Sequence, residues 1–289
     1  MTAHTADEIT GRLRAAGCVF AEEEARLLIA AASTPARLTE MVGQRAGGMP
    51  LEHVLGWAEF CGLRIAVDPG VFVPRRRTEF LVGQAAAGAE AGQSRTGGGP
   101  AGRTGTGGGP AGRARTGGSP AGRPVVVDLC CGSGALGVAL AAALGGADLH
   151  AADVDPAAVA CARRNVIPAG GRVYAGDLFG ALPAELRGRV DILVVNVPYV
   201  PTGEIAMLPA EARDYEPRVA LDGGPDGLDV LRRVAAEAAG WLAPGGRLLT
   251  ETSERQAAAA AQIVAGGGLA AQVISDDELG ATVVTGRPS

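Results

Sequence analysis

The sequence has 289 residues, 47% of them hydrophobic, and a formal net charge of −5. This length suits one large domain and one small one, and no stretch reaches the roughly 18 consecutive apolar residues of a membrane-spanning helix. The acidic balance argues against a protein that grips nucleic acid through its phosphates, so a protein or small-molecule partner is favoured and no membrane partner is expected.

The cysteines and histidines indicate a reducing compartment and no metal centre. The five cysteines show no C-x-x-C spacing, and the three histidines, at positions 4, 53 and 150, have no partner at ligand spacing. The first twelve residues lack the basic and then apolar layout of a secretory signal. We therefore expect a cytoplasmic protein without a bound metal.

Two short segments precede the main domain. Residues 1–55 show helical spacing of apolar residues and predict a small helical domain. Residues 56–74 predict a β-hairpin linker, since the stretch FCGLRIAVDPGVFV alternates and contains a turn signal at Asp68-Pro69-Gly70. The second domain is expected to occupy residues 75–289.

A repetitive insertion interrupts this second domain. Residues 93–123 repeat units such as RTGTGGGPAG with a period of ten and offer no apolar side chain larger than Ala or Pro to bury. We expect this insertion to be disordered and to have no catalytic role, although its five arginines leave open a contact with RNA.

The remaining chain alternates between strands and helices. Strands are predicted at 125–129, 147–153, 172–177, 190–196 and 246–252, which is typical of a doubly wound α/β sheet. Two more, at 270–276 and 281–287, are too close in sequence for a crossover and should pair antiparallel. A Rossmann-like sheet with an antiparallel last strand indicates a class I methyltransferase rather than a dehydrogenase.

A glycine-rich loop follows the first of these strands. Gly132, Gly134 and Gly137 fit the dinucleotide fingerprint, and Asp153 lies about 20 residues on, where an acid binds ribose hydroxyls. Asp128 favours S-adenosylmethionine, because a carboxylate suits its cationic methionine part and would repel a pyrophosphate. The alternative is that Asp128 only caps the turn and Asp153 only ends a strand. We assign cofactor binding to Asp128, Cys130, Cys131, Gly132, Ser133, Gly134 and Asp153.

The sequence Asn196-Val197-Pro198-Tyr199 follows the strand at 190–196 and should lie at the same edge of the sheet. The Asn196 side-chain oxygen and the Val197 carbonyl can accept both N–H groups of an amide or amine, which orients its poorly nucleophilic nitrogen. Pro198 restricts Val197, and Tyr199 offers a flat face. We predict catalytic roles for Asn196, Pro198 and Tyr199 and substrate binding by all four residues, with Asn196 also touching the cofactor; a plain turn is the alternative.

Further motifs extend the pattern along nearly the whole chain. They are Pro50-Leu51-Glu52-His53, Val73-Pro74-Arg75, Gly176-Asp177-Leu178-Phe179, Glu216-Pro217 and Asp226-Gly227-Leu228-Asp229. With the glycine loop and the Asn-x-Pro-Tyr motif, the sequence resembles the HemK/PrmC-type protein-(glutamine-N(5)) methyltransferases, which modify the Gly-Gly-Gln loop of peptide chain release factors. The resemblance implies S-adenosyl-L-methionine as cofactor, a release factor as partner, a helical domain that recognises substrate, and Asp177 and Leu178 beside the adenine.

Three departures from that family separate this sequence from its usual members. Val197 stands where the family has a second proline, Cys130-Cys131 replaces a glycine and a small hydroxyl residue, and the stretch Arg75-Arg76-Arg77 stands where the family tends to have Pro and Glu. The arginines, and the acidic stretch at 204–216, are interpreted as solvated faces, with docking of substrate or closure of a lid as the alternative. A nucleic-acid base N-methyltransferase and a non-catalytic cofactor-binding paralogue remain alternative functions.

Overall fold

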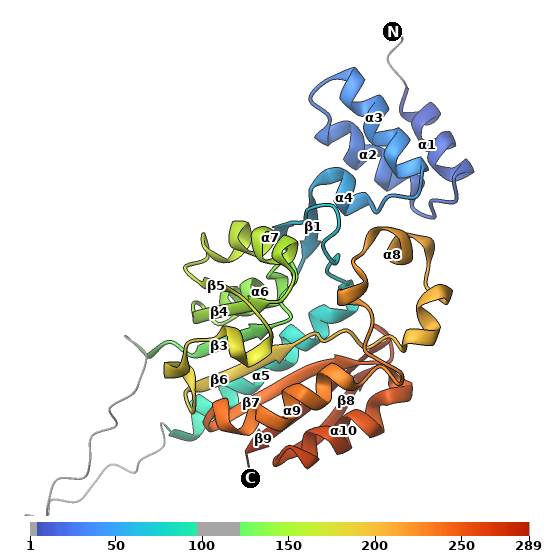
Figure 1. Ribbon diagram of the computed structural model, residues 1–289. Helices are drawn as coiled ribbons and strands as arrows, with labels where there is room; N and C mark the ends of the chain where they lie inside the picture. The colour runs from blue at the N-terminus through green and yellow to red at the C-terminus, as the bar shows by residue number, and fades with distance from the viewer. Residues whose placement is uncertain (1–4, 97–121, 289) are drawn as a thin grey trace, which may run out of the picture.

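The computed structural model describes residues 5–96 and 122–288 (Figure 1). Within these ranges the chain forms a helical bundle, a two-stranded hairpin and an α/β domain. The predicted disordered insertion at 93–123 lies mostly outside the described residues. Its first four residues belong to helix α5 (Glu79–Thr96), so this helix reaches into the repeat.

Four helices make the N-terminal bundle: α1 (Ala6–Ala15), α2 (Ala21–Ala31), α3 (Pro35–Ala46) and α4 (Leu51–Leu55). Ile9, Leu13 and Leu28 are buried in its core. The start of α1 is a capping box, in which the Thr5 hydroxyl accepts the Glu8 N–H and the Glu8 carboxylate accepts the Thr5 N–H. The capping residues Thr5 and Glu8 thus mark the start of α1, and the apolar face of the same helix packs into the core of the bundle.

The hairpin reverses at a different place from the predicted turn. Strand β1 (Trp57–Phe60) pairs antiparallel with β2 (Leu63–Ala66), so the turn residues are Cys61 and Gly62. Their φ angles are 51° and 71°, as a two-residue hairpin turn of this type requires. The turn at Asp68-Pro69-Gly70 forms after β2 and is closed by the Val71 N–H donating to the Asp68 carbonyl. The prediction of the turn position was wrong because a Pro-Gly signal marks a turn without showing which strands pair.

Seven strands form the main sheet in the order β5-β4-β3-β6-β7-β9-β8. The parallel strands are β3 (Val125–Leu129), β4 (Asp148–Asp153), β5 (Arg172–Ala175), β6 (Val190–Val195) and β7 (Leu242–Thr252). Strands β8 (Leu269–Asp276) and β9 (Ala281–Pro288) complete the sheet antiparallel. The predicted doubly wound sheet with an antiparallel last strand is confirmed.

Helices cover both faces of this sheet (Figure 1). On one face lie α5, α6 (Ala135–Ala143) and α7 (Pro156–Val166); on the other lie α9 (Asp229–Trp241) and α10 (Ala257–Gly266). Alternate residues of β3 bury against each layer, with Val126 facing α5 to α7 and Val127 facing α9 and α10. This two-sided burial explains why the central strands β3 and β6 are mainly apolar.

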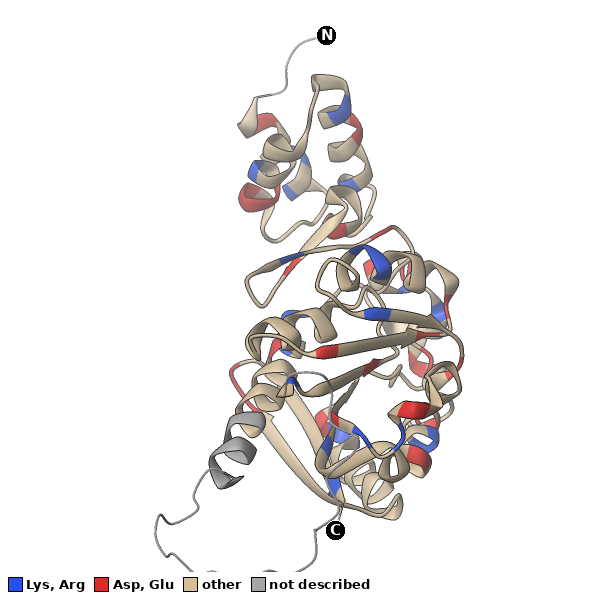
Figure 2. Cartoon of the chain, turned by 90° about the vertical axis from the view of Figure 1, so that its left-hand side faces the viewer, with Lys and Arg blue, Asp and Glu red and all other residues tan. Residues whose placement is uncertain are grey.

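The strand order reverses between β3 and β6, because the chain winds outward in opposite directions from this pair. Ligands of doubly wound sheets bind beyond the carboxyl ends of the strands at such a point. Figure 2 shows the bundle beyond this domain, with acidic and basic residues interspersed over both parts. Among the described residues, no helix is both long and apolar enough to cross a membrane.

Candidate active site

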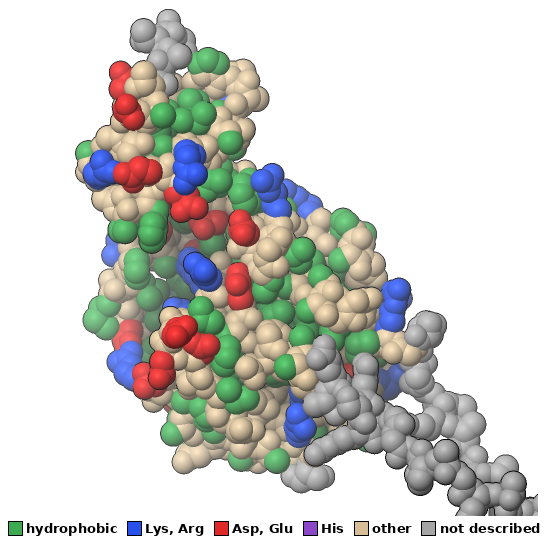
Figure 3. Space-filling model, turned by 180° about the vertical axis from the view of Figure 1, so that it is seen from behind, with side chains coloured by type: hydrophobic (Ala, Val, Ile, Leu, Met, Phe, Trp, Pro, Cys, Tyr) green, Lys and Arg blue, Asp and Glu red, His purple; other side chains and the backbone are tan. Residues whose placement is uncertain are grey.

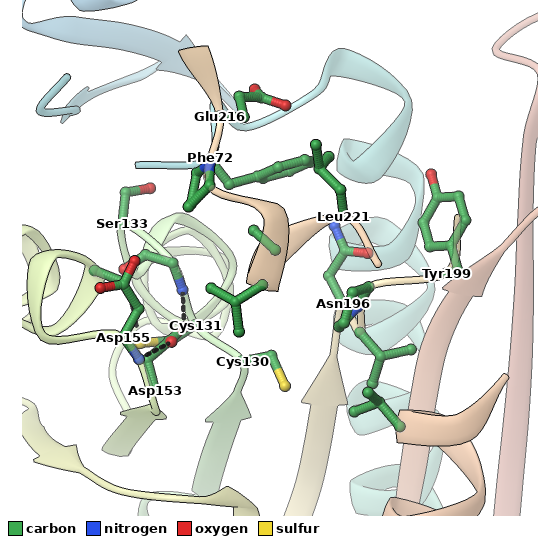
Figure 4. A pocket seen from close by; sticks show the side chains of 18 of the residues that line it. Phe72, Cys130, Cys131, Ser133, Asp153, Asp155, Asn196, Tyr199, Glu216 and Leu221 are labelled. Atoms are coloured by element: carbon green, nitrogen blue, oxygen red, sulfur yellow. Dashed lines mark hydrogen bonds between the residues drawn. The ribbon is translucent and has the colours of Figure 1, made fainter. Parts of the chain in front are cut away.

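A cavity of about 760 Å³ lies at the carboxyl edge of the sheet (Figure 4). One end is lined by the loop after β3, the end of β4 and the residues after β5. The other end is lined by residues 72–78, the Asn196-to-Tyr199 motif and a segment that includes α8 (Ala210–Tyr215). This volume is in the usual range for a small-molecule site. Of the predicted site residues, only Asp128 and Gly134 do not line this cavity.

Asp153 organises the first end of the cavity. One of its carboxylate oxygens accepts the Gly132 N–H at 2.8 Å and the other accepts the Asp155 N–H at 2.9 Å (Figure 4). The positive φ of Gly132, 54°, turns its N–H toward this carboxylate. Asp153 therefore holds the glycine loop against the end of β4 and still offers lone pairs to a ligand.

Gly134 has a structural role behind the loop. Its φ is 78°, and an added Cβ would lie 2.6 Å from the Val166 Cγ2 atom of α7. Asn165 of the same helix donates to the Ser133 carbonyl and also bonds the backbone of Ala66 on β2. No local pattern in the sequence shows that Asn165 ties the loop to the hairpin, since its two partners are far away in sequence.

Cys130 occupies a backbone conformation that favours glycine. Its φ is 53°, in the left-handed region that costs a residue with a Cβ about 1–2 kcal/mol. The next residue, Cys131, is buried and is not among the residues with positive φ. The two cysteines of the loop are therefore not equivalent.

The same substitution should have opposite effects at these two positions. Cys130→Gly relieves the backbone strain, which offsets the added freedom of the unfolded chain, so its free energy of unfolding should match or exceed that of the wild type. Cys131→Gly gains no such relief and loses a buried side chain, so it should destabilise by about 1–2 kcal/mol. Urea unfolding of both variants provides the measurement. Equal losses in both would contradict this reading of Cys130.

Asp128 does not reach the cavity, in contrast to the predicted contact with the cofactor. It is 1% exposed, and one carboxylate oxygen accepts the Gly137 N–H in the first turn of α6 at 2.9 Å. The other oxygen has no hydrogen-bond partner among the described residues. The capping alternative thus describes its contacts, because strand β3 ends with this side chain under the helix rather than above it. Burial raises the pKa of Asp128 to about 8, against the opposing effect of the Gly137 bond.

This raised pKa makes stability depend on pH. Between pH 5 and 8 the unfolded chain releases the Asp128 proton while the folded chain keeps it, so the free energy of unfolding should fall as pH rises. Each unit of pH is worth up to about 1.4 kcal/mol. Asp128→Asn should flatten the profile by about 1 kcal/mol per unit in urea unfolding at pH 5, 6 and 7. Parallel profiles for the variant and the wild type would show that Asp128 ionises normally.

Asp177 and Leu178 line the rim of the same end. Leu178 is buried and has a φ of 46°, which sets its side chain into the cavity wall after β5. The Asp177 carboxylate pairs with Arg233 of α9, which also lines the cavity. Arg233 was not predicted, since only the docking of α9 brings it to this rim.

The Asn196 motif lines the second end of the cavity, across from Asp153 and the glycine loop (Figure 4). The Asn196 side-chain oxygen is buried and lacks a hydrogen-bond partner among the described residues. The Val197 carbonyl likewise accepts no hydrogen bond from that part of the chain. A buried acceptor without a partner is costly, so the Asn196 oxygen, with the next carbonyl along the chain, is a candidate place for a donor group.

A glycine-rich loop, residues 223–227, packs closely against the backbone of the motif. An added Cβ on Gly223 would lie 2.6 Å from the Pro198 carbonyl oxygen, and one on Gly227 would lie 2.3 Å from that of Tyr199. Gln256 donates to the same Tyr199 carbonyl at 3.0 Å. The repeated glycines of residues 223–227 therefore allow a close approach that fixes the motif.

Two groups that were interpreted as solvated faces line the other end of the cavity. Arg75 and Arg77 contribute to its wall, whereas Arg76 is exposed outside it. The Glu216 side chain is fully buried; one of its oxygens accepts the Val73 N–H at 3.1 Å and pairs with Arg75 at 2.6 Å. The solvated interpretation was wrong for Glu216, which is buried, whereas the Arg75 and Arg77 side chains remain 34% and 46% exposed. Each of these arginines nevertheless pairs with a buried carboxylate more than 100 residues away.

The helical bundle reaches the cavity through α8. Arg45 of α3 is buried and pairs with Glu24 at 2.6 Å and with Glu211, a cavity residue, at 2.5 Å. The Tyr215 hydroxyl donates to the Gly47 carbonyl. The surface is hollowed between the bundle and the α/β domain, where apolar and charged side chains meet (Figure 3).

Proteins of similar sequence are methyltransferases. Residues 120–210 match the model of the methyltransferase small domain. A release factor glutamine methyltransferase from Geobacter sulfurreducens is 36% identical over 75% of this chain and 65% of its own length, so the chain spans about two thirds of that relative. One from Deinococcus radiodurans is 32% identical over 86% of this chain and 85% of its own. A 4-amino-L-phenylalanine/4-methylamino-L-phenylalanine methyltransferase from Streptomyces pristinaespiralis is 35% identical over 89% of this chain and 84% of its own.

These relatives, the methyltransferase domain and the sheet with its antiparallel last strand agree with one another. The chain belongs to the release factor glutamine methyltransferase family, a family of enzymes with the class I S-adenosylmethionine-dependent methyltransferase fold.

Proposed function

We propose that this protein transfers a methyl group from S-adenosylmethionine to a glutamine side-chain amide in the Gly-Gly-Gln loop of a peptide chain release factor. The observation that carries the proposal is the pair of unpartnered acceptors, the Asn196 side-chain oxygen and the Val197 carbonyl, beside the cavity. An NH₂ group has two N–H donors and so satisfies both. The names of the bacterial relatives supply the identity of the glutamine and of the partner.

The first end of the cavity fits the cofactor. Asp153 has carboxylate lone pairs to accept ribose hydroxyls, and Gly132 brings backbone close to a ligand. Cys130, Cys131, Ser133, Asp177 and Leu178 would line the bound molecule, with Asn196 at its reactive end, while Asp128 and Gly134 would act only by holding the loop. When bound, S-adenosylmethionine supplies an electrophilic methyl group on a cationic sulfur.

The chain's own contribution to the chemistry is orientation and charge stabilisation. An amide lone pair is delocalised, so it must be aimed along the carbon–sulfur axis to react. With the cofactor bound, the nitrogen would form a bond to the methyl carbon while the carbon–sulfur bond breaks and leaves its electron pair on sulfur, and one N–H proton would then leave to solvent. Asn196 and Val197 hold the nitrogen through its N–H groups and stabilise the positive charge that develops on it. Pro198 and Tyr199 position these acceptors and the plane of the target group.

The bundle, residues 1–55, is proposed to recognise the protein substrate, with the linker at 56–74 joining it to the catalytic domain at 75–289. The contact of Arg45 with Glu211 supports this role, because it connects the bundle to the cavity wall. The partner would thus contact the bundle while its loop enters the hollow between the two parts. A cytoplasmic location follows from that substrate.

The aromatic amine of a free amino acid is a second candidate acceptor. It is favoured by the Streptomyces pristinaespiralis relative, whose similarity extends over 89% of this chain. Phe72 and Tyr199 line the cavity near the motif and could contact an aromatic ring. The same pair of acceptors would hold its NH₂ group.

Incubation with S-adenosylmethionine and unmethylated release factors, followed by mass spectrometry of the Gly-Gly-Gln peptide, tests the proposal. We expect one added methyl on the glutamine, absent with Asn196→Ala. A parallel reaction contains 4-amino-L-phenylalanine. Methylation of that amine without methylation of the peptide would replace the leading proposal with the second candidate, and methylation of neither would refute both.

A further inference from the structure

Tyr199 is held by a closed network of three side chains. Its hydroxyl accepts a hydrogen bond from the Arg77 Nη2 atom at 2.6 Å and donates to a Glu251 carboxylate oxygen at 3.1 Å. The Arg77 Nε atom donates to the same Glu251 oxygen at 2.9 Å. Three residues from the segment before α5, the catalytic motif and β7 therefore meet at one point of the cavity end.

The burial of Glu251 gives Arg77 a specific task. Glu251 is 3% exposed, and its second oxygen has no partner among the described residues. A buried carboxylate needs an opposite charge, and Arg77 is the cation that pairs with it. The planar guanidinium fork fixes the direction of both hydrogen bonds, which an ammonium group on a flexible stem would not do.

Arg77 is the last of the three consecutive arginines that follow Pro74. Arg75 pairs with Glu216, and Arg77 pairs with Glu251. An acid at position 77 would place a second carboxylate near Glu251 and the Tyr199 hydroxyl, and like charges at such a distance repel. Arginine instead closes the network.

We propose that Arg77 is a positioning residue that acts through Tyr199: by pairing with Glu251 and donating to the hydroxyl, it fixes the plane of the ring against which the accepting nitrogen group is placed. The effect of Arg77 on catalysis rests on the proposed function. The positioning of the Tyr199 ring by Arg77 rests only on the three contacts.

The network complements the anchors on the motif backbone. Gln256 holds the Tyr199 carbonyl and also donates to the Asp226 carbonyl at 2.9 Å, so the main chain is fixed at one side. Neither bond restricts rotation of the ring. Because Val197 lacks the ring that a proline would have at this position, the motif is less rigid at its start, and the clamp on the hydroxyl supplies orientation at its other end.

Fluorine NMR of protein labelled with 3-fluorotyrosine tests the contact without any acceptor substrate. The chain has three tyrosines, so three resonances are expected, and Tyr199→Phe identifies one of them. Arg77→Ala should shift the Tyr199 resonance and leave the other two in place. The neighbouring Arg76→Ala is the matched control, since Arg76 is exposed and does not line the cavity, and it should shift none. An unmoved Tyr199 resonance in Arg77→Ala, or an equal shift in Arg76→Ala, would overturn the proposal.

Kinetics on whichever acceptor is methylated then test the catalytic consequence. Arg77→Ala should lower kcat about tenfold, whereas in a Tyr199→Phe background it should lower kcat no further, because the hydroxyl through which it acts is missing. Arg77→Lys should recover part of the loss. Independent losses that multiply in the double variant would overturn the proposal. If Arg77→Ala does not fold, Arg77→Gln takes its place in both experiments.

The two measurements separate this proposal from the proposed function. A shifted fluorine resonance in a protein that methylates neither acceptor refutes the proposed function and supports the positioning of Tyr199 by Arg77. Methylation of the release factor with an unmoved resonance supports the function and refutes that positioning.

Discussion

Asn196→Ala is expected to lower kcat for methyl transfer by two to three orders of magnitude and to leave cofactor affinity within about threefold of the wild type. The loss follows from removing one preorganised polar group that contacts the reacting nitrogen, for which a factor of about 10²–10³ is usual. The Asn196 oxygen has no partner among the described residues, so its removal breaks no hydrogen bond in that part of the fold. Kinetics with the release factor and calorimetry with S-adenosylhomocysteine measure the two quantities.

An amide elsewhere on the surface provides the control. Gln272 of β8 is exposed at the edge of the sheet, and Gln272→Ala should change neither quantity. A normal kcat in Asn196→Ala would remove Asn196 from the mechanism. Loss of cofactor affinity equal to the loss of rate would instead assign it to cofactor binding.

Asp153→Ala is expected to weaken binding of S-adenosylhomocysteine by about 10- to 100-fold. The carboxylate holds the Gly132 and Asp155 N–H groups and is the candidate acceptor for the ribose hydroxyls. Hydrogen bonds to a charged group are worth about 1.5–3 kcal/mol, and each 1.4 kcal/mol is a factor of ten in affinity. Asp153→Asn retains one acceptor oxygen and should lose less. Calorimetry gives the dissociation constants.

The exposed Asp277, between β8 and β9, serves as the matched acid, and Asp277→Asn should bind as the wild type does. The unfolding midpoint of each variant must be measured as well, since Asp153 also supports the loop. Wild-type affinity in a folded Asp153→Ala protein would show that the ribose is not held there.

Most strand bounds could be predicted closely because each signal is local, but β7 begins at Leu242, four residues before the predicted start at 246. The runs 125–129 and 190–196 are mostly apolar, apart from Asp128, Asp191 and Asn196, since both faces of the sheet are covered, and the predicted and observed bounds differ by one residue or less. The antiparallel end of the sheet followed from the short connection between β8 and β9. The hairpin turn was misplaced because Cys61, a residue with a Cβ, adopts the positive φ for which glycine or asparagine is the usual signal.

The sequence predicted those residues of the candidate site that lie together in one short segment. The glycine loop and the Asn196 motif lie at strand ends, and the fold brings them to one cavity. Asp128 has the spacing of a ligand residue, yet its side chain lies under α6, a direction that spacing does not specify. Arg77 and Glu251 lie 174 positions apart, so no local pattern could connect them.

The sequence by itself determined the class of fold, the place of the cofactor loop and the acceptor motif, because periodicity, glycine spacing and strand ends are properties of short segments. Only the tertiary structure decided which charged groups are buried and which partners they meet: buried Arg45 with Glu24 and Glu211, buried Glu216 with Arg75, and buried Glu251 with Arg77. Whether a charge is solvated depends on what the rest of the chain places over it. That packing is a property of the whole fold, and it shapes the acceptor end of the cavity.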